Sequence, residues 1–351
     1  PLMTDNLVKL TLNYDLEFEI DEYYIGRIKE KRGNYLVFEA IDDDTDLGGI
    51  SIFKNGTYKV ETKAPEIDYY QKLEQDNLIK DRFDLKDENK EILSWQWKNL
   101  SELLKIIYDE EFVINIQLKS GNFYSGAIEK VTSRYVYMWE NTDSFDLEEC
   151  ATVIPLKDIS TIDINEIPNV LYDDWYDHME DFDQDYGLIK IHLAYQDDKL
   201  FKEFPIIGKI IKEDGNQILF HRLNVISQID AVTVINKKQI AHMSDTAVDL
   251  PYYNFLLNNN KTKGTFDPHH LLDKSYDMTY ELKENDMVTL DDVIYGRVTG
   301  IIKKKKNDSF VLKEIRDYAY KEELELKYSD IISVDLNSND LFNLKSYRNF
   351  L

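Results

Sequence analysis

The chain has 351 residues, of which 43% are hydrophobic and 13% aromatic, a composition that suits folded cores and argues against disorder. Its 42 basic and 67 acidic residues give a net charge of −25 at pH 7. Such a charge repels phosphate backbones and anionic membranes unless one face is locally basic. No apolar run approaches the roughly 20 residues of a membrane span. The numbers therefore favour a folded chain of about two to four domains, with no membrane partner.

The single cysteine, Cys150, excludes an intrachain disulfide and is typical of a protein in a reducing compartment. Glu148 and Glu149 precede it and disfavour a thiolate, so we expect an inert thiol. The first five residues lack the basic and apolar regions of a secretion signal. These features predict a cytoplasmic location.

One glycine-led pattern occurs four times, which predicts a repeat architecture. In each copy an isoleucine follows the glycine by two residues, turn residues come next, and an apolar strand closes the pattern. A second pair of strands follows in each copy, as in 152–163 and 324–335. Five short, bent strands per repeat predict a small closed barrel. The glycine–isoleucine pairs are Gly26 and Ile28, Gly126 and Ile128, Gly208 and Ile210, and Gly300 and Ile302.

Within the second repeat, Val113–Ile128 contains a strand, a turn at Gly121 and a bent strand, and Ile154–Ile162 follows as a closing strand pair. Residues 113–163 thereby resemble the Sm-like family of small β-barrels. The resemblance implies RNA binding through an Asp-and-Asn loop and an Arg-Gly loop. At those two places this chain has Met-Trp-Glu-Asn at 138–141 and Pro-Leu-Lys-Asp at 155–158, so the RNA-binding residues are largely missing.

We therefore predict a mainly β fold of four tandem Sm-like small β-barrels joined by short helical segments. The predicted divisions are listed in chain order: barrel repeat 1 at 1–75, a helical connector at 76–110, barrel repeat 2 with a trailing acidic helix at 111–183, barrel repeat 3 at 184–262 and barrel repeat 4 at 263–351.

Helices are expected between the barrels. Trp97, Leu100, Leu104 and Ile107 have the spacing of one helix face. Pro168 opens a second helix, whose apolar stripe is Leu171, Trp175, Met179 and Phe182. Aromatic tails that should pack across the other barrels are Tyr69-Tyr70, 252–256 and 341–344. The polar segment 258–267 predicts an exposed linker.

The helix after Pro168 also carries a candidate partner-binding face. Like charges at helical spacing oppose helix formation, which points to a cation-rich partner. In so acidic a chain, a solvated face is the plainer interpretation. The residues of this face are Asp173, Asp174, Asp177, Glu180 and Asp181.

Two alternating acidic runs, Asp42-Asp44-Asp46 and Asp181-Asp183-Asp185, invite a calcium interpretation. Both place glycine at loop position seven rather than six and lack the glutamate at position twelve, so we expect solvated loops. One cysteine and six histidines offer no zinc spacing. We predict no metal site, no cofactor and no catalytic residues.

A candidate nucleic-acid contact is the basic run in the hairpin of the fourth repeat. A solvated turn is its ordinary explanation, and a phosphate-binding patch is the alternative. Lys29, Lys31 and Arg32 occupy the matching hairpin of the first repeat. The candidate contacts are Lys303, Lys304, Lys305 and Lys306, with the aromatic residues Tyr135, Tyr137 and Trp139.

The sequence predicts a non-catalytic cytoplasmic binding or scaffold protein whose main partner is another protein, because varied loops stand on a repeated scaffold. Three alternatives stay open. The first is an RNA-binding or single-strand-binding protein that uses the Sm-like loops. The second is an acidic DNA mimic that inhibits a nucleic-acid enzyme, and the third is an enzyme whose site lies between repeats.

Overall fold

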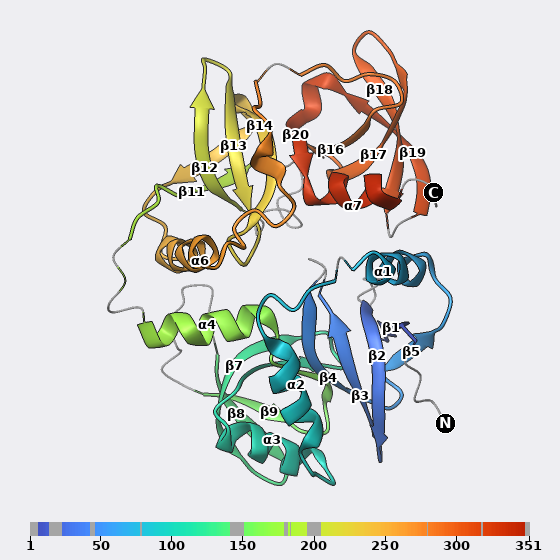
Figure 1. The fold of residues 1–351 in the computed structure, drawn as a ribbon, viewed down its shortest axis with the longest axis vertical. Coiled ribbons are helices and arrows are strands. Elements are labelled where there is room, and N and C mark those ends of the chain that lie inside the picture. The colour runs from blue at the N-terminus through green and yellow to red at the C-terminus, as the bar shows by residue number, and fades with distance from the viewer. Residues whose placement is uncertain are drawn as a thin grey trace. The chain divides into compact units, whose positions relative to one another are not determined.

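The computed structural model describes residues 6–13, 23–42, 46–77, 79–140, 151–178, 182, 184–194, 205–278, 280–316 and 319–347. The chain forms two compact units, Pro1–Asp177 (unit 1) and His178–Leu351 (unit 2). Each unit holds one ten-stranded antiparallel sheet, coloured blue to green in unit 1 and yellow-green to red in unit 2 (Figure 1). The prediction of a mainly β fold is confirmed.

In unit 1 the strands follow the spatial order β5-β1-β2-β3-β4-β10-β6-β7-β8-β9. Their bounds are β1 Val8–Leu12, β2 Tyr23–Arg32, β3 Tyr35–Ile41, β4 Leu47–Lys54, β5 Tyr58–Glu61, β6 Val113–Leu118, β7 Phe123–Val131, β8 Tyr135–Glu140, β9 Thr152–Pro155 and β10 Ile159–Ile164.

Unit 2 repeats this order as β15-β11-β12-β13-β14-β20-β16-β17-β18-β19. The bounds are β11 Ile189–Leu193, β12 Ile206–Glu213, β13 Gln217–Leu223, β14 Ile229–Asn236, β15 Ile240–Ser244, β16 Met287–Asp292, β17 Gly296–Lys305, β18 Ser309–Arg316, β19 Ala319–Lys327 and β20 Ile331–Ser338.

The four closed barrels that we predicted are not formed by the strands that the structure describes. Each repeat does supply five strands, but β4 pairs with β10 of the next repeat, and β14 pairs with β20. Two five-stranded halves thereby join into one continuous sheet. The physical reason is that tandem linkage gives the outer edge of β4 a strand to bond, which satisfies its backbone groups without closure.

The glycine-led repeat is visible in the register of all four hairpins. The ladder skips one residue directly after Ile28, Ile128, Ile210 and Ile302. Such a bulge bends the strand and increases its twist. A Cβ on Gly26, Gly126, Gly208 or Gly300 would lie inside contact distance of a carbonyl oxygen of the facing strand. Only glycine permits that close approach, which explains why each hairpin begins with one.

Helices cover the sheets and connect the repeats. Unit 1 contains α1 (Pro65–Gln75), α2 (Leu85–Ser94), α3 (Leu100–Asp109) and α4 (Ile167–His178), whose last residue belongs to unit 2. Unit 2 contains α6 (Leu250–Lys263), α7 (Asn339–Tyr347) and the short 3₁₀ turns η2 (Lys237–Gln239), η3 (Leu271–Asp273) and η4 (Tyr328–Asp330). None of the described helices is long and apolar enough to cross a membrane.

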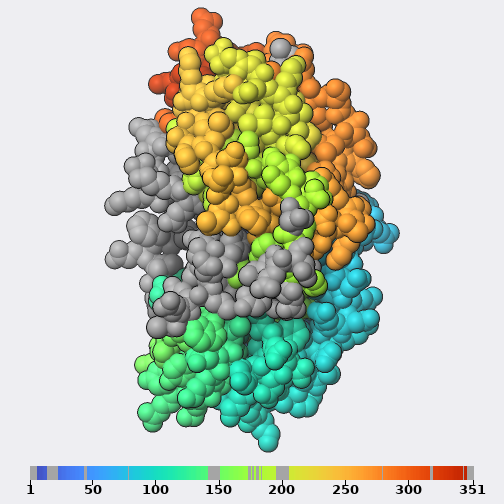
Figure 2. All heavy atoms as spheres, turned by 90° about the vertical axis from the view of Figure 1, so that its left-hand side faces the viewer, coloured from blue at the N-terminus to red at the C-terminus, as the bar shows by residue number. Residues whose placement is uncertain are grey.

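The expected helix faces are buried. Trp97 precedes α3, and Leu100, Leu104 and Ile107 of α3 join the core cluster of the second repeat. In the space-filling view, the cyan and green part of unit 1 forms one continuous surface (Figure 2). Leu171 and Trp175 of α4 are buried as predicted, whereas Met179 lies outside the described residues.

Two loop predictions are wrong. Residues 258–263 of the predicted linker lie in α6, and Asn260 there is buried and donates to the carbonyl of Ile226. The polarity that suggested a linker serves a buried side-chain hydrogen bond instead. Asp46 does not lie in a solvated loop: it is fully buried and pairs with Arg82 at 2.7 Å. Burial raises the pKa of Asp46 to about 6, although Arg82 opposes the shift.

Candidate functional site: an acidic pocket in unit 1

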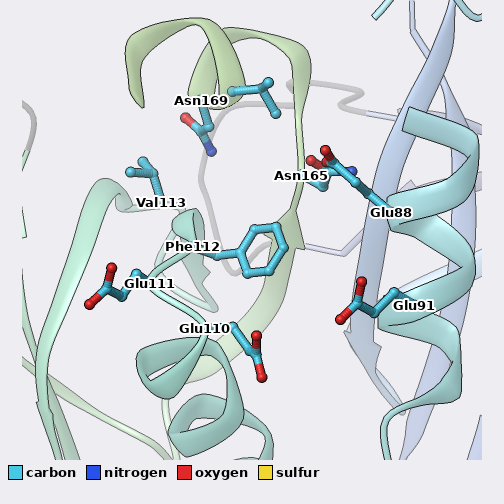
Figure 3. A pocket seen from close by; sticks show the side chains of 9 residues that line it. Glu88, Glu91, Glu110, Glu111, Phe112, Val113, Asn165 and Asn169 are labelled. Atoms are coloured by element: carbon cyan, nitrogen blue, oxygen red, sulfur yellow. The ribbon is translucent and has the colours of Figure 1, made fainter. Parts of the chain in front are cut away.

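A pocket with a volume of about 380 Å³ lies in unit 1 between α2, the turn from α3 to β6, and the start of α4. Figure 3 shows the ring of Phe112 in the middle of this pocket, with carboxylates from α2 on one side and from the α3–β6 turn on the other. The lining residues are Glu88, Glu91, Glu110, Glu111, Phe112, Val113, Asn165, Asn169 and Val170.

The two glutamates of α2 are placed by its amphipathic spacing. Leu85, Asn89 and Ile92 lie on the buried face, at positions i, i+4 and i+7. Glu88 and Glu91 fall beside that face and are exposed. The carboxylate of Asp81 accepts from the backbone N–H of Leu85 at 2.8 Å, which satisfies a free donor of the first turn. The helix therefore presents both glutamates from a capped, anchored element.

The opposite wall of the pocket is the tight turn that ends α3. Glu110 is the C-cap, Glu111 has a left-handed φ of 60°, and Phe112 donates its N–H to the carbonyl of Ile107 at 3.2 Å. This hydrogen-bond pattern is a Schellman motif, in which glycine or asparagine ordinarily takes the left-handed position. The turn directs Phe112 toward the core, where its ring meets Trp95 edge-on at 5.7 Å. Glu111 therefore holds a strained backbone position at the pocket wall.

The back of the pocket holds buried amides. Asn165 is only 1% exposed, and its Nδ2 donates to Oδ1 of Asn89 at 3.3 Å. Asn89 in turn donates to the carbonyl of Gly48 at 2.9 Å, which ties α2 to β4. The Oδ1 atom of Asn165 is buried and has no hydrogen-bond partner among the described residues. An unsatisfied buried acceptor costs about 1–3 kcal/mol, so a hydrogen-bond donor at this oxygen would be stabilising.

The four glutamates have no ion-pair partner within the described part of the chain. The nearest lysine on α2 in sequence, Lys90, pairs with Asp87 at 2.6 Å instead. In the described residues, no three acidic, histidine or cysteine side chains come close enough together to hold a metal ion. The carboxylates therefore surround a volume and do not converge on one point. Such an arrangement suits a cationic group larger than a metal ion.

No protein-family model matches the sequence, and no curated protein matches it either. The chemistry of the pocket must be argued from its own residues.

Unit 2 has a cavity of about 400 Å³ at the corresponding place. The strand registers make Asn285 the counterpart of Glu111, and Asp286 the counterpart of Phe112. Here Asp335 and Lys345 line the cavity, so both signs of charge are present. The acidic character of the unit 1 pocket therefore belongs to its side chains and does not follow from the backbone that the two units share.

Beside the unit 2 cavity lies an ionic cluster. Arg297 pairs with Asp335 at 2.7 Å, with Asp340 at 3.3 Å and with Asp291 at 3.7 Å. Thr233 donates to the other oxygen of Asp335 at 2.8 Å. Burial raises the pKa of Asp335 to about 6, against the opposing effect of Arg297. Each of the three aspartates in this cluster has an ion pair within unit 2, so we interpret the cluster as structural.

The predicted partner-binding residues lie partly outside what the structure describes. Asp173, Asp174 and Asp177 belong to α4, but their side chains are not described. Glu180 and Asp181 lie outside the described residues, as do Cys150 and Asp183. The first turn of α4 contributes Asn169 and Val170 to the pocket, so the acidic helix begins at the pocket wall.

The candidate nucleic-acid contacts fall into two groups. Tyr135, Tyr137 and Trp139 alternate along β8 on the side opposite to the buried Val136 and Met138. The basic run from Lys303 to Lys306 lies on β17 and its turn in unit 2.

Acidic and aromatic residues face the basic run. Lys306 pairs with Glu325 at 2.6 Å, and Lys303 lies over the ring of Tyr320 at 5.9 Å. In the matching hairpin of the first repeat, Lys29 pairs with Glu39 at 2.7 Å. Neighbouring carboxylates therefore neutralise part of the positive charge on which phosphate binding would depend.

Sequence reasoning missed the four pocket glutamates. They come from two segments, 88–91 and 110–111, and an acidic background hides them. One signal was present: the amphipathic helix 100–109 ends in Glu-Glu-Phe, with no glycine at the position where a helix end favours it.

Proposed function

We propose that this protein is a non-catalytic, cytoplasmic scaffold that binds a protein partner through a basic side chain inserted into the acidic pocket of unit 1. The observation that carries the proposal is the set of four unpaired carboxylates around a cavity that also has an aromatic wall. Unpaired like charges repel one another, and a cation from a partner relieves that repulsion.

We further propose that each set of five strands is a barrel-like module that resembles the Sm-like family. The bulged, glycine-led hairpins support this, since they bend the sheet within every repeat. RNA binding is the less favoured function, because Lys306 and Lys29 already have carboxylate partners. The charge of −25 also opposes it.

The proposal is tested by purifying the tagged chain from its native cells at about 150 mM salt, with and without nuclease. The decisive variant is E88Q/E91Q, which removes two exposed pocket carboxylates and keeps side-chain size and helix propensity. We expect a protein partner that survives nuclease with the wild type and is lost with this variant.

The matched control is E322Q/E323Q on β19, which removes the same charge from two exposed residues in unit 2. This control should retain the partner. A partner that E88Q/E91Q retains equally well contradicts the proposal, and so does recovery of RNA alone, lost on nuclease treatment.

A further inference from the structure

We propose that the pocket of unit 1 is a receptor for the guanidinium group of an arginine, in preference to the ammonium group of a lysine. The inference rests on the proposed function, because it names the chemical class of the side chain that the partner inserts. The juxtaposition that carries it is an aromatic ring, carboxylates on both sides of it and a buried, unsatisfied acceptor.

The spread of the carboxylates is the first argument. Glu88 and Glu91 approach from α2, and Glu110 and Glu111 from the α3–β6 turn (Figure 3). No three acidic, histidine or cysteine groups in the described chain are close enough to share a metal ion. A compact, strongly hydrated ammonium neutralises one or two neighbouring carboxylates, whereas a guanidinium presents five N–H donors in a plane toward several acceptors.

The ring of Phe112 is the second argument. It is only partly buried, and it stands among the carboxylates in the middle of the pocket. A planar guanidinium stacks on an aromatic face and is less hydrated than an ammonium, so it loses less solvation on entering. Trp95 contacts the Phe112 ring edge-on, with the ring centroids 5.7 Å apart. The aromatic wall is therefore preformed.

The Oδ1 atom of Asn165 is the third argument. It is independent of the acidic cluster, because the residue is neutral, 1% exposed and anchored through its own Nδ2 to Asn89. Its oxygen lacks a donor among the described residues, although Asn165 lines the pocket. A guanidinium in the pocket offers this acceptor one N–H once the Asn165 side chain turns toward it, while the other N–H groups reach the glutamates. An ammonium group has only three donors for the same set of acceptor oxygens.

The test uses the full chain and two capped pentapeptides, Gly-Gly-Arg-Gly-Gly and Gly-Gly-Lys-Gly-Gly. Binding is followed by two-dimensional NMR of the backbone amides of Glu111, Phe112 and Asn165. We expect the arginine peptide to shift these signals with an affinity at least about fivefold higher than the lysine peptide. E88Q/E91Q should weaken both peptides by about tenfold, and E322Q/E323Q should leave both unchanged.

A second variant isolates the ring. F112L keeps an apolar side chain at the helix end but removes the aromatic face, so it should bring the two affinities together. Equal affinities in the wild type, or tighter lysine binding, overturn the guanidinium assignment and leave the proposed function standing. Peptide shifts confined to other residues overturn the assignment as well. If the arginine peptide binds but the native partner ignores E88Q/E91Q, the proposed function fails and the assignment stands.

Discussion

The two units fold on one plan and bury an aspartate at the same point of it, Asp163 in unit 1 and Asp335 in unit 2, but they give it different partners. Where β10 meets β6 in unit 1, buried amides and carboxylates share hydrogen bonds. Asn169 donates to Asn115 at 3.2 Å, and Asn115 donates to the carboxylate of Glu166. The buried Asp163 accepts from the hydroxyl of Tyr24 at 3.2 Å. Where β20 meets β16 in unit 2, Arg297 holds Asp335 and Asp291. The shared backbone therefore sets where polar groups are buried, and the side chains decide whether a hydroxyl or an arginine meets the buried aspartate.

The difference extends to the two cavities. In unit 2 the cavity is lined by Glu281, Asp286, Asp335 and Lys345, and Arg297 pairs with Asp335 at 2.7 Å. Cations therefore balance part of its acidic charge. In unit 1 the four pocket glutamates have no ion-pair partner among the described residues. A repeat protein that duplicates its scaffold is thus able to keep one copy structural and leave the other free to bind. This is our reason for placing the function in unit 1.

The largest expected effect comes from breaking the ionic cluster. R297M leaves the buried Asp335 without its hydrogen-bonded cation and leaves Asp291 with Arg222 alone, at 3.9 Å. We expect unit 2 to lose about 2–4 kcal/mol at pH 7. The register counterpart in unit 1 is Phe123, which is 54% exposed, so F123M should cost less than about 0.5 kcal/mol.

Urea unfolding separates the two units because all four tryptophans lie in unit 1. Tryptophan fluorescence therefore reports unit 1, and far-UV circular dichroism reports both. R297M should shift a transition seen by circular dichroism and leave the fluorescence transition in place. An equal shift in both signals contradicts the view that the cluster stabilises unit 2 alone.

The next effect is the pH dependence of the free energy of unfolding, which arises from a different buried carboxyl in each unit. Burial raises the pKa of Asp46 in unit 1 and of Asp335 in unit 2 to about 6, against about 3.9 in an unfolded chain. Between about pH 4 and 6 the folded state thus binds more protons than the unfolded state. The free energy of unfolding due to each group therefore falls as the pH rises through this window, by on the order of 1–3 kcal/mol.

The measurement is urea unfolding at several pH values between 4 and 7. D46N should flatten this pH dependence in the fluorescence signal, and D335N should flatten it in the circular dichroism signal assigned to unit 2. A fluorescence slope of the same size in D46N and the wild type would show that Asp46 does not titrate in this range.

Much of the strand pattern is predictable because its causes are local. The glycine that permits close cross-strand approach and the isoleucine before the bulge recur at fixed spacing, and the structure places both as expected. Leu100, Leu104 and Ile107 likewise show their buried face through helical spacing alone. Barrel closure is not local, since nothing within β4 tells whether β5 or β10 will bond its outer edge.

The candidate site escaped the sequence for the same reason. Glu88 and Glu111 are 23 residues apart and look like two of 67 acidic residues until the fold places them around Phe112. Asn260 shows the converse error, since a polar side chain that seemed to mark a linker is buried and bonded to Ile226. In both cases a partner that is distant in sequence gives the side chain its role.

The smallest expected effect gives the most direct comparison of the two units, because the substitutions exchange one residue between equivalent positions. Glu111 and its counterpart Asn285 both have a left-handed backbone, with φ values of 60° and 71°. Every residue with a Cβ is strained in this conformation, but the short polar side chain of asparagine offsets the strain by hydrogen-bonding to the local backbone, which glutamate does less readily. E111N should therefore stabilise unit 1 by about 0.5–1 kcal/mol in fluorescence-detected unfolding, and N285E should destabilise unit 2 by a similar amount.

The same E111N variant removes one of the four pocket carboxylates, so it should also weaken binding of the arginine peptide. A gain in stability that comes with a loss of binding is the behaviour of a residue kept for function at the expense of the fold. If E111N binds the peptide as tightly as the wild type, Glu111 has no part in the pocket. If it destabilises unit 1, the strain at this helix end is not relieved by asparagine, and the equivalence of the two positions fails.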